Sequence, residues 1–154
     1  MEKTNVMRIL DQKKIAYTPH YYTDSDAISG MEVATYLNLD PNKVFKTLVT
    51  VGASKRNYVF VVPVNAELNL KKAASAVNEK SIEMIKSKDL LDLTGYIHGG
   101  CSPIGMKKPF RTVMNDSALK YDTITFSAGK IGYQVEMNPN DLKKIINITY
   151  IEII

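Results

Sequence analysis

Cysteine and tryptophan are almost missing from this sequence: its 154 residues include one cysteine and no tryptophan. A single cysteine cannot form an internal disulfide, which argues against a disulfide-stabilised secreted scaffold and makes the cytoplasm the expected location. Long apolar runs are missing too, because the longest, residues 59–64, is far below the roughly 20 residues needed to cross a bilayer. The first residues also lack a basic stretch followed by an apolar block. We therefore expect no secretory signal and no membrane association.

Arginine is scarce as well, since 17 of the 20 basic residues are lysine, and the net charge is only +4. Lysine makes loose contacts with phosphates, whereas arginine can read guanine through two parallel hydrogen bonds. The composition is compatible with an RNA partner that is recognised through its backbone or its end, and it predicts no DNA-binding function.

The remaining composition is that of an ordinary folded protein, with 45% hydrophobic and 23% charged residues. No repeat, low-complexity segment or linker divides the chain, and its length suits one domain. Residues 1–154 are therefore expected to form a single unit.

Periodicity and capping signals predict short helices alternating with strands. Thr4 and Asn69 are expected N-caps, and Asn138 followed by Pro139 marks another helix start. Strands in clusters with helices between them indicate an α+β fold with a mixed, strongly curved sheet. The expected helices cover about residues 5–14, 31–39, 70–77, 81–85 and 139–145. The expected strands are 15–22, 44–51, 58–64, 122–126, 131–136 and 148–153, and the pairs 44–64 and 122–136 should be hairpins, the second turning around residues 127–130.

Lys46 is the first candidate for chemistry. Alternation along residues 44–51 places its side chain on the face of Leu48 and Thr50, and the opposite face is also largely apolar. A lysine in such a strand either snorkels past the edge of the sheet or stands at the wall of a pocket. In the second case its ammonium would meet a phosphate or a polarised carbonyl in a poorly hydrated cleft.

Residues 99–108, Gly-Gly-Cys-Ser-Pro-Ile-Gly-Met-Lys-Lys, are the second candidate. Three glycines and a proline in the first seven positions predict a sharply bent backbone whose amides can turn inward. Such a nest can bind an oxyanion or a phosphate, although an ordinary tight loop has the same composition. The segment lacks the Gly-Lys-Ser/Thr ending of a P-loop, and no strand–GxGxxG–helix arrangement surrounds it.

The second predicted hairpin is the third candidate. Residues 131, 133 and 135 are large and apolar and should face the core, whereas Gly132, Gln134 and Glu136 share the other side. A glycine between two polar residues leaves room for a ligand, or only for solvent, to approach the backbone.

No arrangement typical of a protein nucleophile or a metal centre is evident. Cys101 lies three residues from His98, and His20 is far away, so the spacing does not predict a cysteine with its general base. Two histidines and one cysteine at irregular spacing make a poor zinc site, and the carboxylates form no paired motif. We expect neither metal nor cofactor, and a thiol hydrolase based on Cys101 is the weaker hypothesis.

Three motifs occur together in an order typical of one family: Phe-Lys-Thr-Leu at 45–48, the glycine-rich run at 99–108, and Ser-Ala-Gly-Lys at 127–130. With them, nearly the whole sequence resembles the YbaK/EbsC family, relatives of the editing domain of bacterial prolyl-tRNA synthetases. It is most similar to the branch of free-standing Cys-tRNA(Pro) deacylases. The resemblance implies an α+β fold with a mixed, barrel-like sheet and surrounding helices. It also implies hydrolysis of the ester that joins an amino acid to the terminal adenosine of tRNA.

The resemblance also implies roles for single residues. Lys46 matches the lysine on which the family depends, in contact with the aminoacyl-adenosine or its phosphate. Gly99 and Gly100 match the backbone that surrounds the ester carbonyl, and Ser127 and Gly129 match a second wall of the pocket. Under this interpretation Cys101 is a packing residue.

The mechanism implied by this branch uses no protein nucleophile. The thiol of the cysteine substrate attacks its own ester carbonyl, forms a cyclic thiolactone and releases the tRNA. A thiol held beside its own carbonyl has a very high effective concentration, and backbone amides can stabilise the developing oxyanion. Serine or alanine cannot supply an equivalent nucleophile.

Two further positions concern recognition of the substrate. Tyr22 matches an aromatic near the mouth of the pocket, whereas Gln134 replaces a pocket aspartate of some relatives. An amide can orient the substrate amine by hydrogen bonding but cannot act as a base or counter-charge. Deacylation of another small residue such as alanine thus stays open, as does a non-catalytic module that binds the tRNA end or a synthetase. The expected partners are the tRNA acceptor end and a prolyl- or cysteinyl-tRNA synthetase.

Overall fold

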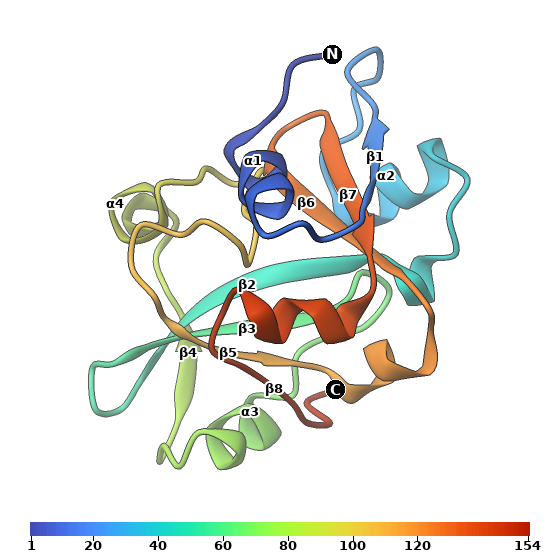
Figure 1. Ribbon diagram of the computed structural model, residues 1–154. Helices are drawn as coiled ribbons and strands as arrows, with labels where there is room; N and C mark the ends of the chain where they lie inside the picture. Colours follow the sequence, from blue (N-terminus) through green and yellow to red (C-terminus); the bar gives the residue numbers. More distant parts are fainter.

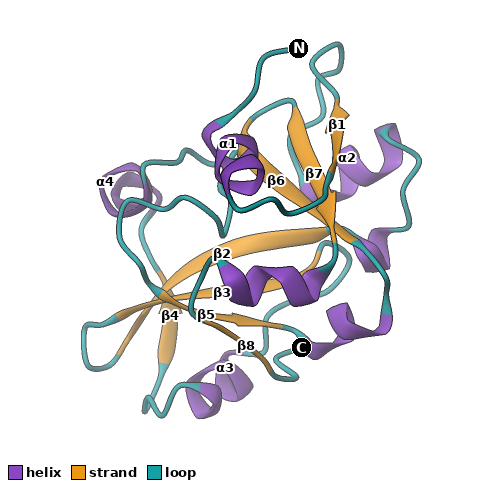
Figure 2. Ribbon diagram, viewed as in Figure 1, coloured by secondary structure: helices purple, strands orange, loops and turns teal.

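In the computed structural model, which describes residues 1–154, two separate β-sheets organise the chain (Figures 1 and 2). The smaller sheet has the strand order β1-β7-β6, and the larger has the order β4-β2-β3-β5-β8. The strands are β1 (Thr18–Tyr21), β2 (Phe45–Gly52), β3 (Asn57–Pro63), β4 (Ile82–Met84), β5 (Arg111–Met114), β6 (Ile124–Lys130), β7 (Tyr133–Met137) and β8 (Ile148–Tyr150). The α-helices are α1 (Asn5–Gln12), α2 (Gly30–Tyr36), α3 (Leu70–Ala76) and α4 (Leu90–Thr94), and the 3-10 helices are η1 (Pro41–Lys43), η2 (Ser87–Asp89), η3 (Asp116–Lys120) and η4 (Pro139–Lys144).

The predicted α+β class with a mixed sheet is confirmed, but the sheet does not close into a barrel. β2 pairs antiparallel with β3 and β4, whereas β3 with β5 and β5 with β8 are parallel. Each sheet keeps two edges, β4 and β8 in the larger and β1 and β6 in the smaller. A single parallel bridge between Val44 and Thr125 connects them. No helix of the structure has the length and apolar character that crossing a membrane requires.

β3 accounts for the longest apolar run of the sequence. Val59 and Val61 point into the main core, whereas Phe60 and Val62 pack in a second cluster together with α3. A strand that is buried on both faces needs no polar alternation. The main core also includes residues of β2, β6 and β7, and α1 and η4 contribute to it from outside the sheets (Figure 1).

The predicted helix caps are confirmed. Thr4 Oγ1 accepts a hydrogen bond from the N–H of Met7, and Asn69 Oδ1 accepts from the N–H groups of Lys71 and Lys72. These bonds satisfy amides that the first turn of a helix leaves without a partner. At Asn138 the cap is present too, but it opens a 3-10 helix rather than an α-helix.

Two local predictions are wrong. The segment 81–85 is not a helix but contains the edge strand β4, because pairing with β2 decides the conformation of a stretch too short to show a clear period. Residues 127–130, predicted as a turn, continue β6 through an irregularity of register. The hairpin turns instead at Ile131 and Gly132, where Gly132 has a φ of 97°, a conformation that favours glycine.

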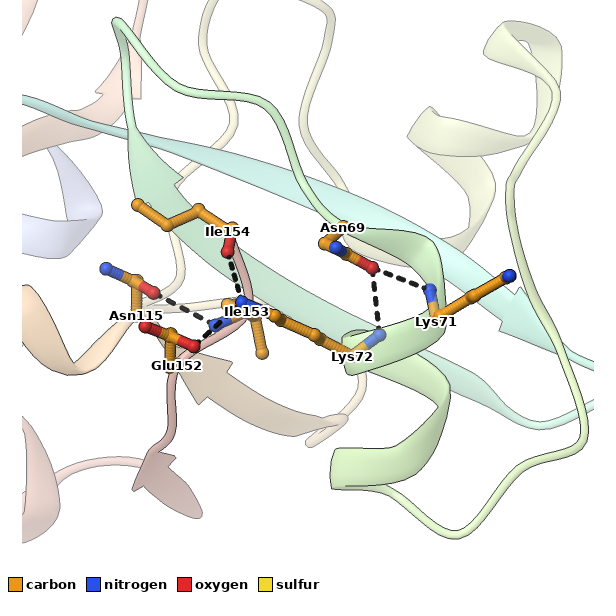
Figure 3. A network of polar contacts seen from close by, with 7 residues as sticks. All are labelled: Asn69, Lys71, Lys72, Asn115, Glu152, Ile153 and Ile154. Carbon is orange, nitrogen blue, oxygen red and sulfur yellow. Dashed lines mark hydrogen bonds and ion pairs between the residues drawn. The ribbon is translucent and has the colours of Figure 1, made fainter.

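The last residues of the chain are fixed to the larger sheet by a polar network (Figure 3). The N–H of Ile153 donates to Oδ1 of the buried Asn115 at 3.0 Å, and the Ile153 carbonyl accepts from the Asn69 N–H at 2.7 Å. At the surface, Lys72 Nζ donates to Glu152 Oε2 at 2.7 Å and to the carbonyl of Ile154 at 2.8 Å. The network holds Ile153 in the second cluster.

We expect Asn115→Ala to lower the free energy of unfolding by about 2 kcal/mol, because the N–H of Ile153 would stay buried without an acceptor. Urea denaturation followed by circular dichroism measures the change. Lys72→Ala removes an exposed contact of the same network and should have a much smaller effect. Equal losses in the two variants would contradict the importance of the buried acceptor.

Candidate active site

A cavity of about 560 Å³ lies between the start of α2, β2 and the segment that joins β4 to α4. The glycine-rich loop adds His98, Gly99 and Cys101 to its lining, and β6 and β7 add Ser127 and Gln134. No aspartate or glutamate lines the cavity, and Lys46 and His98 are its only basic side chains. The cavity is therefore suited to an anionic or neutral ligand.

Lys46 lies at the cavity wall. Of the two positions considered for its side chain, the structure therefore shows the wall of a pocket and not the edge of the sheet. Its strand is covered on both faces, by Phe45 and Val49 in the main core and by Leu48 against the second cluster. The Lys46 side chain is 29% exposed, and its Nζ lies 3.6 Å from Oε1 of Glu67, which is 95% exposed. Such a solvent-exposed ion pair is weak, so an incoming anion can replace Glu67.

The two glycines of the loop have different positions. Gly99 lines the cavity with a φ of 86°, and a Cβ there would lie 3.2 Å from Cγ2 of Ile28. Gly100 lies outside the lining, donates its N–H to the Ile97 carbonyl at 3.0 Å, and packs against the backbone of Ile131. No hydrogen bond within the protein engages the N–H of Gly99 or of Cys101. Of the three amides at 99–101, those of Gly99 and Cys101 are therefore free, and both of these residues line the cavity.

Ser127 and Gln134 face each other across the β6–β7 pair, and both line the cavity. Gln134 is only 6% exposed, and its Oε1 has no hydrogen-bond partner. Thr47, next to Lys46, has an unpartnered buried Oγ1 as well. Because a buried polar atom without a partner costs stability, these two oxygens indicate where a ligand could supply donors.

Gly129 and Tyr22 lie outside the cavity lining. Gly129 donates its N–H to Ser127 Oγ at 3.1 Å, and its φ of 90° brings its backbone against Tyr96. It therefore shapes the strand that carries Ser127. Tyr22 is buried in the interior rather than exposed at the mouth of the pocket. Its N–H donates to the Gly132 carbonyl, and its hydroxyl has no hydrogen-bond partner.

Cys101 and His98 both line the cavity, but no hydrogen bond joins them. Burial raises the pKa of the Cys101 thiol to about 12, against a smaller opposing effect of a hydrogen bond with Thr94. At neutral pH the thiol is protonated, whereas a cysteine nucleophile acts as the thiolate. The geometry offers no activated cysteine.

Several lining residues were not predicted from the sequence. Ile28, Ser29 and Gly30 precede or begin α2, and a Cβ at Gly30 would lie 2.3 Å from Cγ1 of Val64. Met84 and Ile85 belong to the segment that was predicted to be helical. No clear signal in the sequence marks this segment, since Met84 and Ile85 are adjacent and a serine separates the two lysines.

Residues 26–145 match the model of the aminoacyl-tRNA editing domain. The chain belongs to the aminoacyl-tRNA editing domain family. This editing-domain chain is 45% identical over 153 residues to an Enterococcus faecalis protein named as a candidate Cys-tRNA(Pro)/Cys-tRNA(Cys) deacylase, EbsC, and the match covers 99% of this chain and 93% of that protein. It is 28% identical over 111 residues to the proline–tRNA ligase of Thermosipho melanesiensis, covering 71% of this chain and 18% of the ligase.

A solved structure has the same fold as this editing-domain chain. It is described as a candidate trans-editing enzyme for prolyl-tRNA synthetase, and it superposes with a TM-score of 0.82 at 19% identity over 99% of this chain and 98% of the other. At this identity the likeness establishes the fold alone. The other protein thus shares the overall fold of this chain.

Proposed function

We propose that this protein hydrolyses mischarged aminoacyl-tRNA in the cytoplasm, with Cys-tRNA(Pro) as its substrate and residues 1–154 acting as one editing unit. The observation that carries the proposal is a cavity that combines Lys46 with free loop amides and unpartnered oxygens, but contains no acid and no activated nucleophile. Such a site can bind and polarise an ester, and His98 is the one lining side chain that could act as a general base. Family membership and the name of the Enterococcus faecalis relative support the same substrate class.

In the proposed reaction the nucleophile comes from the substrate. The thiol sulfur of the esterified cysteine attacks the carbonyl carbon, a carbon–sulfur bond forms, and the bond to the 3′ oxygen of the terminal adenosine breaks. The thiol proton ends on that oxygen, which leaves as the tRNA hydroxyl, and water later opens the thiolactone to free cysteine. Because the step is intramolecular, it needs no separately bound nucleophile.

The residues of the cavity have distinct tasks in this proposal. The N–H groups of Gly99 and Cys101 stabilise the oxyanion, and the Lys46 ammonium meets the carbonyl oxygen or the adjacent phosphate. Gln134 Oε1 accepts a hydrogen bond from the substrate ammonium, and Ser127 stands opposite Gln134 on the same wall. Gly100, Gly129 and Tyr22 support these residues from outside the lining.

A panel of tRNAs charged with cysteine, alanine, serine and proline tests the proposal. We expect purified protein to release cysteine from Cys-tRNA(Pro) and to leave the other three nearly intact over the same time. Release of labelled amino acid, separated from tRNA by acid precipitation, measures each rate. Rapid release of alanine would favour a deacylase for another small residue. Binding of all four charged tRNAs without release would instead show a non-catalytic module that binds the tRNA end or a prolyl- or cysteinyl-tRNA synthetase.

A further inference from the structure

The segment 84–90 forms a wall of the cavity with an unusual alternation. Met84, Ile85, Ser87 and Leu90 line the cavity, while Lys86 and Lys88 between them are exposed. Neither lysine lies within 4.0 Å of a carboxylate, unlike Lys46 and other lysines that form ion pairs. Two exposed lysines without an ion-pair partner therefore lie on the segment that forms this wall.

Lys86 and Lys88 share their part of the chain with three carboxylates, so their availability depends on the absence of ion pairs and not on net charge. Glu83, Asp89 and Asp92 belong to the same part of the chain, but none of them pairs with a lysine. The backbone of Lys107 lies at the end of α4, where its N–H donates to the Thr94 carbonyl at 2.9 Å. Ammonium groups without an internal partner are available to phosphates.

Exposed apolar side chains surround the same cavity. Met84 is 48% exposed at one wall, and Ile28 and Met31 are exposed at the wall formed by the start of α2. Single exposed apolar residues are common, whereas three that line one cavity form an apolar patch of the kind that marks a ligand-binding site. A nucleotide has a flat apolar base and an anionic phosphate, so an apolar side chain between the cavity and two lysines matches both parts.

We propose that Met84, Lys86 and Lys88 form a docking surface for the single-stranded 3′ end of an RNA. The two lysines bind the phosphates of the nucleotides before the terminal adenosine, and Met84 supports one of their bases. The inference rests on the proposed function and extends it, from the ester inside the cavity to the strand that leads into it. It assigns the segment 84–90 to RNA rather than to a synthetase surface.

Binding of an uncharged tRNA acceptor minihelix ending in CCA tests the surface without requiring any catalysis. Fluorescence anisotropy at increasing KCl gives both the Kd and its salt dependence. We expect Lys86→Ala with Lys88→Ala to weaken binding roughly tenfold near 0.1 M salt and to reduce the salt slope by about 1.4, the value for two single-strand phosphates. Met84→Ala should weaken binding several-fold while the salt slope stays the same, because it removes an uncharged contact.

Lys71→Ala with Lys120→Ala is the matched control, since it removes two exposed, unpaired lysines from α3 and η3, which contribute nothing to the cavity lining. Its salt slope should stay close to that of the unmodified protein. Equal effects of the two double variants would overturn the proposal, because they would indicate only general charge. Unchanged RNA binding by the Lys86 and Lys88 variant, with loss of synthetase binding, would overturn it in favour of a protein partner. Since the RNA carries no amino acid, these outcomes are independent of whether the protein deacylates Cys-tRNA(Pro).

Discussion

Lys46→Ala should lower kcat/KM for Cys-tRNA(Pro) by about 100-fold or more. Lys46 is the one lysine of the cavity lining, and its only ionic partner is a glutamate that is almost fully exposed. Removing one preorganised group that stabilises the transition-state charge costs roughly 10²- to 10³-fold in an ester-cleaving site. The measurement is the steady-state rate of cysteine release at several substrate concentrations. Circular dichroism and thermal unfolding must show that the variant is folded.

Three variants distinguish catalysis from general electrostatics. Lys71→Ala removes an exposed lysine from α3 and should leave kcat/KM nearly unchanged. Glu67→Gln removes the partner 3.6 Å from Lys46 Nζ without removing the ammonium, so activity should be kept or slightly raised. Lys46→Arg keeps the charge but changes its shape, and partial activity is expected. Full activity of Lys46→Ala would remove this residue from the proposed site.

Capping the thiol of the esterified cysteine should slow deacylation by at least roughly 10³-fold, because attack within the substrate has an effective concentration that water cannot match. No carboxylate lines the cavity, so His98 is the one lining side chain that could activate a water molecule instead. The comparison uses S-methylated Cys-tRNA(Pro) against unmodified Cys-tRNA(Pro), with cysteine thiolactone trapped and identified by mass spectrometry. Continued rapid hydrolysis of the capped substrate would show that water is the nucleophile.

Cys101→Ala is the control for the thiol experiment, since it asks whether a thiol of the protein takes part. Burial raises the pKa of this thiol to about 12, so its reactive form is scarce at neutral pH. We expect the variant to retain at least half of the activity, with any loss caused by altered packing of the loop. A loss as large as that of Lys46→Ala would support the thiol hydrolase hypothesis.

The local fold was predictable where short-range signals and tertiary contacts agree. The β2–β3 hairpin and the caps at Thr4 and Asn69 follow from alternation and from side chains that can satisfy helix amides. β5 was missed because its four residues pair in parallel with β3 and β8, which are distant in sequence. The open sheets were not predictable from the family resemblance, which implied a barrel, because closure depends on edges that local patterns do not reveal.

The candidate site was predictable only in part. Alternation singled out Lys46, and its place at the cavity wall fits that prediction, while its role in catalysis stays a prediction. The two glycines of the loop could not be distinguished by sequence, because the bond from the Gly100 amide to Ile97 depends on how the loop folds. The wall at 84–90 was hidden for the same reason, since its lining residues meet β2 only after β4 has paired.

A cavity lined by no aspartate or glutamate has a consequence for correctly charged tRNA. The cavity of about 560 Å³ must hold the terminal adenosine together with the amino acid, so its volume does not by itself select between cysteine and proline. If the attacking group must be brought by the amino acid itself, a prolyl ester can enter, rest against the same amides and leave intact. Fidelity then comes from the inability of the prolyl ester to react, and the protein does not have to exclude proline by size.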